Sequence, residues 1–219
     1  MEVITLRDPN AYGELKSLGV NRPVTKVAAD PVLALSPSDL SVGLEILKNE
    51  QIPLDRPIIS ICVRKWKMVS RSEKILASLA DRVSSELNAI PLFVPMQHPD
   101  DLHFSKKILR LMKEKGYLIY GSYSVDETMS ILGNTDLLIG MRLHSLIYAV
   151  NMGLPMVGLA YEPKVDYFMK SVNQPYVPWD ENFSMQELMH KIHEVWQNAS
   201  SIKAILEEIR PSLKAKIIK

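Results

Sequence analysis

The sequence predicts an α/β fold in which a Rossmann-like parallel sheet of about five strands is flanked by helices. First, apolar runs of strand length alternate along the chain with longer stretches of helical period. Second, each run is continuously apolar, as in strands that are buried on both faces of a parallel sheet. Third, the 219 residues are 47% hydrophobic, a globular composition with enough length for one large domain or one domain and part of another.

The predicted strands and helices follow one another in a regular order. The first strand is the run PIISICV, which contains the single cysteine, and the last is PMVGLAY. Between consecutive strands lie helical stretches that would serve as the crossovers of a parallel sheet. The predicted strands are 57–63, 90–96, 117–121, 136–140 and 155–161, and the predicted helices are 71–88, 101–116, 124–132 and 143–152.

Residues 1–52 do not continue this alternation. They contain a strand-like EVITLRD, a short helix ending near LGV, the segment VAADPVLAL and a second short helix opened by PSD. We interpret 1–52 as the remnant of a preceding domain with a linker, and 53–219 as a Rossmann-like domain that ends in a helical stretch. That stretch, 184–210, begins at a capping box of Ser184 and Glu187, and the basic tail KAKIIK is interpreted as a frayed end.

The composition argues against several classes of function. The 26 basic and 25 acidic side chains give a net charge of +1 without long basic runs, so we expect no nucleic-acid partner. The N-terminus lacks the basic and apolar regions of a signal peptide, and no apolar run approaches the roughly 20 residues of a spanning helix, so we expect a cytoplasmic protein. Cys62 stands alone inside an apolar run, which predicts a buried structural thiol, and no Cys/His cluster predicts a metal site.

Four loops lie where ligands usually bind in this fold class, beyond the carboxyl ends of the strands and before helix N-termini that favour anions. They are VRKW after the first strand, PMQHPDD after the second, GSYSVDE after the third and GMRLHS after the fourth. In the last of them, Arg142 offers a planar fork suited to carboxylate or phosphate, and His144 titrates near neutrality and can exchange a proton. The alternative is that Arg142 pairs with a carboxylate on the next loop and His144 caps its own helix.

The run GMRLHSLIYAVNMGLPMVGLAYEPKVDYF, residues 140–168, resembles the signature region of the polysaccharide pyruvyl transferase family, in particular its bacterial CsaB-type members. ITLRDPNAYGELKSLGV and VAADPVLAL are similar to the family's Arg-Asp segment and its downstream Ala-Asp-Pro. ISICVRKW and VPMQHPDDLHFSKKI fall in the expected order before the signature. The resemblance covers the chain from Val3 to about Trp179, and its most specific part is Arg-Leu-His-Ser with Pro-Lys-Val downstream.

The resemblance implies a glycosyltransferase-B arrangement of two Rossmann-like domains, of which this chain looks like the C-terminal portion. A complete member would carry a Gly-rich first domain that residues 1–52 cannot supply, so the activity of this chain alone is left open. The implied reaction moves pyruvate from phosphoenolpyruvate onto two sugar hydroxyls as a cyclic ketal, in the biosynthesis of a cell-wall or other surface polysaccharide. The implied partners are phosphoenolpyruvate and a glycan or lipid-linked saccharide, through which the protein would associate peripherally with a membrane.

Ketal formation gives the loop residues specific tasks. The methylene carbon of the donor must be protonated, a sugar oxygen must reach C2 and phosphate must leave, which needs an acid, anion clamps and in principle no metal or cofactor. His144 suits the acid or base, and Arg142 suits the donor's carboxylate or phosphate. Lys164, just past the fifth strand, can neutralise the leaving phosphate, with a surface salt bridge as the alternative. Glu162 would orient Lys164 or bind an acceptor hydroxyl, or else lie in solvent.

Further candidates follow other strands. After the first strand, Arg64 can grip a phosphate and Trp66 can stack on a sugar face, or both belong to a snorkelling surface edge. His98, after the second strand, is interpreted as a loop histidine rather than a ligand. Arg7 and Asp8 end the strand-like run near the N-terminus, where the sequence is equally compatible with donor binding and with an ion pair that fixes the turn.

Two other classes of function remain open on the sequence. A sugar-nucleotide glycosyltransferase or epimerase of the same fold would need a Gly-rich phosphate loop and an acidic residue for the ribose diol, for which Glu162 is the only near fit. The other class is a non-catalytic binding fragment. Binding of phosphoenolpyruvate, but of no sugar nucleotide, would favour pyruvyl transfer over the first class.

Overall fold

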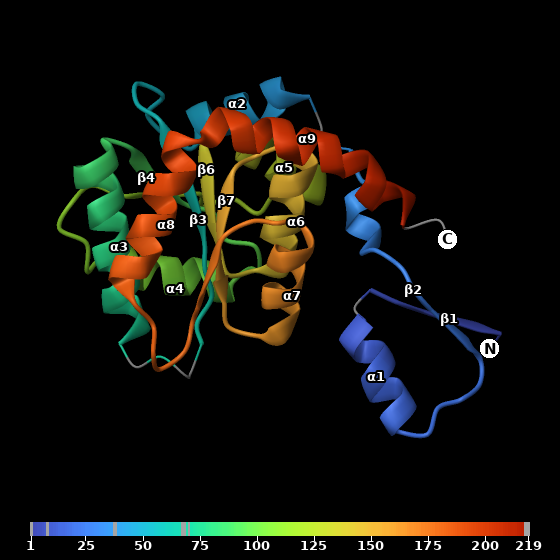
Figure 1. Cartoon of the computed structure of the whole chain (residues 1–219). Helices are drawn as coiled ribbons and strands as arrows, with labels where there is room; N and C mark the ends of the chain where they lie inside the picture. The colour runs from blue at the N-terminus through green and yellow to red at the C-terminus, as the bar shows by residue number, and fades with distance from the viewer. Residues whose placement is uncertain (1, 8, 37–38, 67–68, 70, 217–219) are drawn as a thin grey trace.

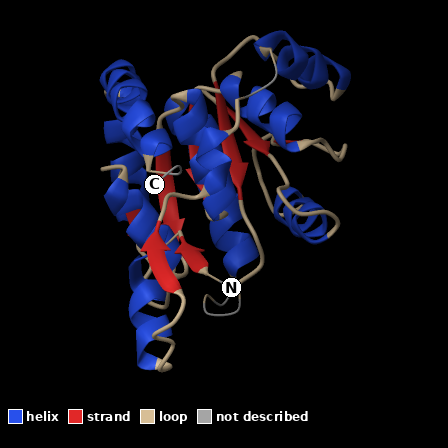
Figure 2. Ribbon diagram, turned by 90° about the vertical axis from the view of Figure 1, so that its right-hand side faces the viewer, coloured by secondary structure: helices blue, strands red, loops and turns tan. Residues whose placement is uncertain are grey.

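The computed structural model describes residues 2–7, 9–36, 39–66, 69 and 71–216. Its centre is a six-stranded parallel sheet with helices on both faces (Figure 1, Figure 2), which confirms the predicted fold class. The strands lie in the order β5-β4-β3-β6-β7-β8. Their bounds are β3 Ile58–Cys62, β4 Ile90–Phe93, β5 Tyr117–Leu118, β6 Leu137–Gly140, β7 Met156–Ala160 and β8 Tyr176–Pro178.

The order of the strands reverses between β3 and β6. Strands β3, β4 and β5 lead to one edge of the sheet, and β6, β7 and β8 lead to the other. Since Cys62 of β3 pairs with Gly140 of β6, the loops that follow these two strands leave the sheet side by side. In open α/β sheets the crevice outside such a reversal point is where ligands bind.

The burial of the strands agrees with the apolar runs that predicted them. Every residue of β3, β4 and β6 is buried, because helices cover both faces of the sheet. One apolar core lies between one face and helices α3 Ser72–Leu87, α4 Asp100–Leu109 and α8 Met185–Gln197. The core on the other face includes α2 Leu40–Asn49, α5 Val125–Gly133, α6 Leu143–Met152, α7 Pro163–Ser171 and α9 Ala199–Ala215.

Helix α7 and strand β8 were not predicted from the sequence. Helix α7 buries only Val165 and Met169, one turn apart, so its helical period is hard to detect. Strand β8 has three residues and ends at Pro178, which is too short for a recognisable run. The predicted helix 101–116 is also shorter in the structure, because it ends at Leu109.

The C-terminal helical stretch is two helices. The Ser184 hydroxyl accepts a hydrogen bond from the Glu187 N–H at the start of α8, as predicted, whereas the Glu187 carboxylate pairs with Lys191. Helix α9 then continues past Pro211 to Ala215. The prediction of a frayed basic tail is therefore wrong for its first two residues, which are helical, and its last three, 217–219, lie outside the described residues.

Residues 1–52 divide into two parts. Strands β1 Val3–Leu6 and β2 Val24–Val27 form a separate two-stranded parallel sheet beside helix α1 Pro9–Ser17, away from the main sheet (Figure 1). The 3₁₀ helix Pro31–Ala34 and α2 instead pack on the main body and contribute to its core. The division of the chain at residue 52 stays a prediction, but α2 packs with the sheet that follows it.

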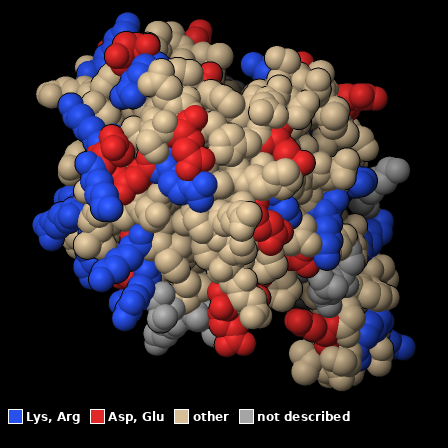
Figure 3. Space-filling view, turned by 60° about the vertical axis from the view of Figure 1, so that its left-hand side comes forward, with Lys and Arg blue, Asp and Glu red and all other residues tan. Residues whose placement is uncertain are grey.

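The surface in Figure 3 carries both signs of charge. Basic and acidic side chains are interspersed on this face, in keeping with the net charge of +1. Such a face gives little electrostatic attraction for nucleic acid. Within the part of the chain that the structure describes, no helix combines the length and the apolar character needed to cross a bilayer.

We expect Gly43→Ala to lower the free energy of unfolding by about 1–3 kcal/mol, the usual cost of overpacking. The N–H of Gly43 donates to the Ser130 hydroxyl at 2.8 Å, and a Cβ on Gly43 would lie 2.2 Å from the Ser130 carbonyl oxygen. Thermal unfolding measures the effect, with Gly13→Ala in α1 as the control, since a Cβ there meets no atom within 4 Å. Equal melting temperatures for the two variants would contradict the close packing of α2 on α5.

Candidate functional site

A cavity of about 350 Å³ lies at the carboxyl edge of the main sheet. It brings together five residues that the sequence analysis singled out: Arg7, Arg64, Arg142, His144 and Lys164. They come from the ends of β1, β3, β6 and β7, which are far apart in sequence. Met96, Gln97, Leu143, Tyr148 and Tyr161 complete its lining.

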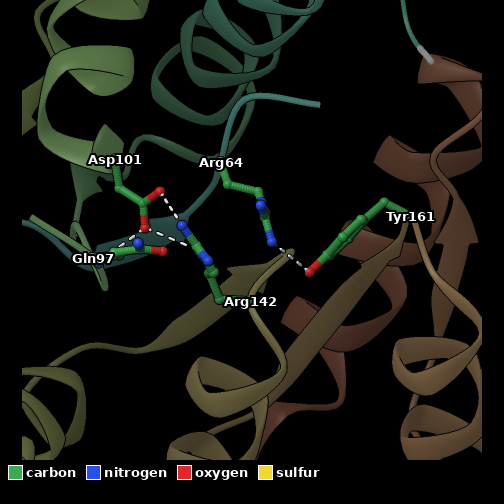
Figure 4. Close-up of polar contacts among 5 residues, drawn as sticks. All are labelled: Arg64, Gln97, Asp101, Arg142 and Tyr161. Atoms are coloured by element: carbon green, nitrogen blue, oxygen red, sulfur yellow. Dashed lines mark hydrogen bonds and ion pairs between the residues drawn. The ribbon is translucent and has the colours of Figure 1, made fainter. Parts of the chain in front are cut away.

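Arg142 is held by a buried carboxylate. Its Nε donates to Asp101 Oδ2 at 3.0 Å and its Nη2 donates to Asp101 Oδ1 at 2.6 Å (Figure 4). The Asp101 side chain is 1% exposed, against 17% for Arg142, and Asp101 Oδ2 also accepts from the Gln97 N–H. The alternative left open by the sequence was a carboxylate on the next loop, whereas the carboxylate that pairs with Arg142 lies in the first turn of α4. Two of the five guanidinium N–H groups are used, which leaves three for a ligand.

His144 is the second residue of α6 and is exposed to the cavity. Its ring lies 6.5 Å from the Tyr148 ring, one helical turn further on. The helix-cap alternative gains no support, since the N-cap residue Arg142 makes no side-chain cap and the described residues include no hydrogen-bond partner for the His144 imidazole. The first backbone N–H groups of α6 have no acceptor within the helix, and they lie next to His144.

Lys164 and Glu162 form an ion pair at the start of α7, with Nζ 2.5 Å from Oε2. The Lys164 side chain is 40% exposed and reaches the cavity, whereas Glu162 is absent from the cavity lining. This geometry matches the expectation that Glu162 orients Lys164. The same ion pair is also the salt bridge that was the alternative interpretation of Lys164. The contact is therefore compatible with a binding role and with a structural role of this lysine.

Arg64 reaches the cavity from a cluster of aromatic rings. Its Nη1 donates to the Tyr161 hydroxyl at 3.2 Å (Figure 4). Its guanidinium carbon lies 5.3 Å from the centre of the Tyr161 ring and 5.5 Å from that of Trp66, distances typical of cation–π contacts. Trp66 packs edge-to-face on Tyr161 and does not line the cavity, so it is not placed to stack on a sugar there.

Arg7 reaches the same cavity from the small sheet. Its Nη1 lies 2.8 Å from Oδ2 of Asp30, a carboxylate that also caps the 3₁₀ helix through the Val32 N–H. The ion pair with Asp8 that the sequence left open falls on a residue outside the described ones. Asp30 therefore gives Arg7 a partner that no local sequence pattern indicated.

Cys62 lies at the end of β3 and is fully buried, as predicted. Burial raises the pKa of the Cys62 thiol well above its usual range, although the nearby Ser145 hydroxyl opposes the shift. A protonated, enclosed thiol is not a nucleophile. Cys62 therefore packs in the core beneath the loops of the site and is not a candidate for its chemistry.

Three residues at the cavity, Asp101, Tyr148 and Tyr161, were not predicted from the sequence. Asp101 belongs to the loop PMQHPDD that was singled out, but a sequence does not distinguish a buried carboxylate from a solvated one at a helix start. Tyr148 lies four residues after His144, a helical spacing that places the two side chains on one face. Tyr161 directly precedes Glu162 and is the last residue of the fifth predicted strand, so its place in the sequence indicated a position at the ligand-binding edge of the sheet.

The family model for polysaccharide pyruvyl transferase matches residues 2–163, well over half of the chain. The chain belongs to this family. Arg7, Arg64, Arg142 and His144 lie inside the matched segment, and Lys164 follows its last residue. The sequence resemblance stated above is thus confirmed for the family. No curated protein matches the sequence.

The fold of this chain is similar to that of several solved structures. A glycosyltransferase from Rickettsia africae is 12% identical over 99% of this chain and 59% of its own, with a TM-score of 0.66. HepE of Anabaena, solved with UDP-glucose, is 13% identical over 99% and 60%, with a TM-score of 0.64. The UDP-GlcNAc 2-epimerase of Neisseria meningitidis is 11% identical over 99% and 58%, with a TM-score of 0.63. These likenesses show a glycosyltransferase-B-like fold, and the chain spans about three fifths of each of these structures.

Proposed function

We propose that this chain carries the donor site of a pyruvyl transferase, which moves pyruvate from phosphoenolpyruvate onto two hydroxyls of a surface polysaccharide sugar as a cyclic ketal. The observation that carries the proposal is the convergence of Arg7, Arg64, Arg142, Lys164 and His144 on one cavity. Phosphoenolpyruvate is small and carries a carboxylate and a phosphate. Charge-assisted hydrogen bonds from arginine and lysine recognise both groups.

The cavity has one more positive charge than its paired carboxylates neutralise, so it attracts an anion. Arg7, Arg142 and Lys164 each pair with one carboxylate, whereas Arg64 contacts only the Tyr161 hydroxyl and two aromatic rings among the described residues. One guanidinium charge is thus left without an acidic partner. The N-terminus of α6 adds free N–H groups and a favourable dipole at the same place.

The reaction assigns a proton transfer to His144. The methylene carbon of phosphoenolpyruvate gains a proton and becomes a methyl group, and two sugar oxygens form bonds to C2. The C2–O bond to phosphate breaks. The two sugar hydroxyls lose two protons in total, which corresponds to one proton gained by the methyl group and one carried by the released hydrogen phosphate. His144 brings an imidazole to the cavity, the side-chain type that serves most often as a general acid or base.

Arg142 would meet the donor with its outer edge. Asp101 occupies the Nε and Nη2 side of the guanidinium, so the donor would be bound by the remaining N–H groups. A guanidinium fixed in this way loses little side-chain freedom on binding, which favours affinity. Lys164 would lie near the leaving phosphate and neutralise its charge.

A sugar-nucleotide glycosyltransferase or epimerase is the second candidate, because two of the structural neighbours were solved with UDP-sugars. Glu162, the acidic residue that could bind a ribose diol, is paired with Lys164 and does not line the cavity. The cationic lining suits a small dianion or trianion better than a nucleoside. Pyruvyl transfer is therefore the function that the geometry supports best.

Phosphoenolpyruvate at about 100 times its dissociation constant should stabilise the chain by about 2.7 kcal/mol. For a chain of this size this corresponds to an increase in melting temperature of roughly 5–10 °C. Thermal unfolding with phosphoenolpyruvate, pyruvate, inorganic phosphate and UDP-glucose measures it. Lys164→Met should lower phosphoenolpyruvate affinity about 10- to 100-fold through the loss of one charge-assisted contact, whereas Lys170→Met, on the same helix but outside the cavity, should not. A larger shift with UDP-glucose would favour the second candidate.

A further inference from the structure

A second cavity, of about 110 Å³, adjoins the cationic one. It lies beyond the carboxyl ends of β4 and β5, and both cavities are lined by Met96 and Tyr148. The loop after β5, GSYSVDE, is one of the four loops that follow strand ends, where ligands bind in this fold class. That loop forms one wall of this second cavity.

Among the described residues, the lining of the second cavity includes no lysine, arginine, aspartate or glutamate. Four lining residues carry hydroxyl groups, namely Ser122, Tyr123, Thr128 and Tyr148, and the lining also includes His98 and several valine and isoleucine residues. The Tyr123 hydroxyl donates to Glu50 and the Thr128 hydroxyl donates to the Ser124 carbonyl oxygen. Among the described residues, the Ser122 hydroxyl and the His98 ring have no hydrogen-bond partner. Hydroxyl groups beside apolar surface fit a neutral polyhydroxylated ring, such as an uncharged sugar, and not a phosphate or carboxylate.

The wall of this cavity is fixed by a single carboxylate. Glu50 accepts hydrogen bonds from the Tyr120 N–H at 3.0 Å, the Gly121 N–H at 2.7 Å and the Tyr123 hydroxyl at 2.9 Å. Burial, with the neighbouring Glu50, raises the pKa of Tyr123 to about 12. Three hydrogen bonds to one carboxylate thus tie the loop after β5 to the end of α2.

Tyr148 lies at the junction of the two cavities. It is 6% exposed, and its hydroxyl has no hydrogen-bond partner in the part of the chain that the structure describes. Burial raises the pKa of Tyr148, so the hydroxyl stays protonated at neutral pH and can donate a hydrogen bond. It is one helical turn from His144 on the same helix.

We propose that the second cavity binds the uncharged acceptor sugar ring and that Tyr148 donates a hydrogen bond to it, with the reacting hydroxyls directed toward His144. The proposal rests on the proposed function, since it takes the cationic cavity as the donor site. Because the two cavities adjoin, a neutral diol in the second cavity and an anionic donor in the cationic cavity would approach the His144 imidazole from different sides. It makes Tyr148 a binding residue for the acceptor and not for the donor.

The test uses methyl β-D-galactopyranoside, an uncharged sugar with free 4- and 6-hydroxyls, as the probe. Saturation-transfer NMR measures its binding to the chain saturated with phosphoenolpyruvate. Tyr148→Phe removes only the hydroxyl and should weaken glycoside binding about 3- to 10-fold, the effect of one hydrogen bond. Tyr120→Phe is the matched control, because Tyr120 is 56% exposed and lines neither cavity, and it should leave binding unchanged.

A second variant blocks the cavity without touching Tyr148. Val125, at the start of α5, lines the cavity and is 43% exposed, so Val125→Trp can fill it at little cost to the fold. Glycoside binding should be lost while phosphoenolpyruvate binding stays within a few-fold of the parent. Unchanged glycoside binding in both variants, or no glycoside signal from the parent, would overturn this proposal. Absence of phosphoenolpyruvate binding in the parent would instead overturn the proposed function.

Discussion

Replacing His144 with glutamine should slow ketal formation by about 100- to 10,000-fold, the usual contribution of a general acid or base. The imidazole is exposed to the cavity and makes no hydrogen bond among the described residues, and its ring lies 6.5 Å from that of Tyr148, which lines both cavities. Glutamine has a similar size and keeps a polar end, but it cannot carry a proton. The rate is measured as the release of phosphate from phosphoenolpyruvate in the presence of the acceptor, with a preparation whose unsubstituted protein catalyses this release.

The same variant should keep its fold and most of its affinity for phosphoenolpyruvate, because the proposed donor site holds the anion through its arginine and lysine side chains. His190→Gln is the matched control: His190 lies on α8, its side chain is 71% exposed and it does not line the cavity. Its turnover should equal that of the parent. If His144→Gln turns over within a few-fold of the parent, the proton comes from another group and His144 has no part in the chemistry.

The fold was predictable from the sequence where burial is two-sided. Strand β3 lies in the middle of the sheet, all five of its residues are buried, and the run PIISICV predicted it. Strand β8 lies at the edge, is three residues long and is only partly buried, so it left no continuous apolar run. Helix α7 was missed for a related reason, since two buried side chains in nine residues do not make a period.

The residues that line the cationic cavity were predictable because the end of each parallel strand lies at the same edge of the sheet. Arg64, Arg142 and Lys164 follow β3, β6 and β7, and the position of each was readable from its strand. Their partners were not predictable, because they depend on tertiary packing. Asp101 is 41 residues from Arg142, and nothing local in PMQHPDD shows that its second aspartate is buried while its first is exposed.

Asp101→Asn should lower the free energy of unfolding by about 3 kcal/mol, at the low end of the cost of breaking a buried ion pair. The carboxylate is 1% exposed and accepts from two Arg142 nitrogens and from the Gln97 N–H, whereas an amide offers one accepting oxygen and turns N–H groups toward other donors. Arg142 is then left charged, largely enclosed and without its partner. Thermal or denaturant unfolding measures the loss, which corresponds to a decrease in melting temperature of roughly 6–12 °C.

The released guanidinium should also weaken phosphoenolpyruvate binding, since it no longer presents its outer N–H groups in a fixed direction. Asp100→Asn is the matched control: Asp100 lies in the same first turn of α4 but is exposed, so its loss should cost less than about 1 kcal/mol. A double-mutant cycle with Arg142→Gln separates the ion pair from other effects of either change. If Asp101→Asn and Asp100→Asn are equally stable and bind the donor equally well, the pair does not position Arg142, and the arginine must be held by the ligand itself.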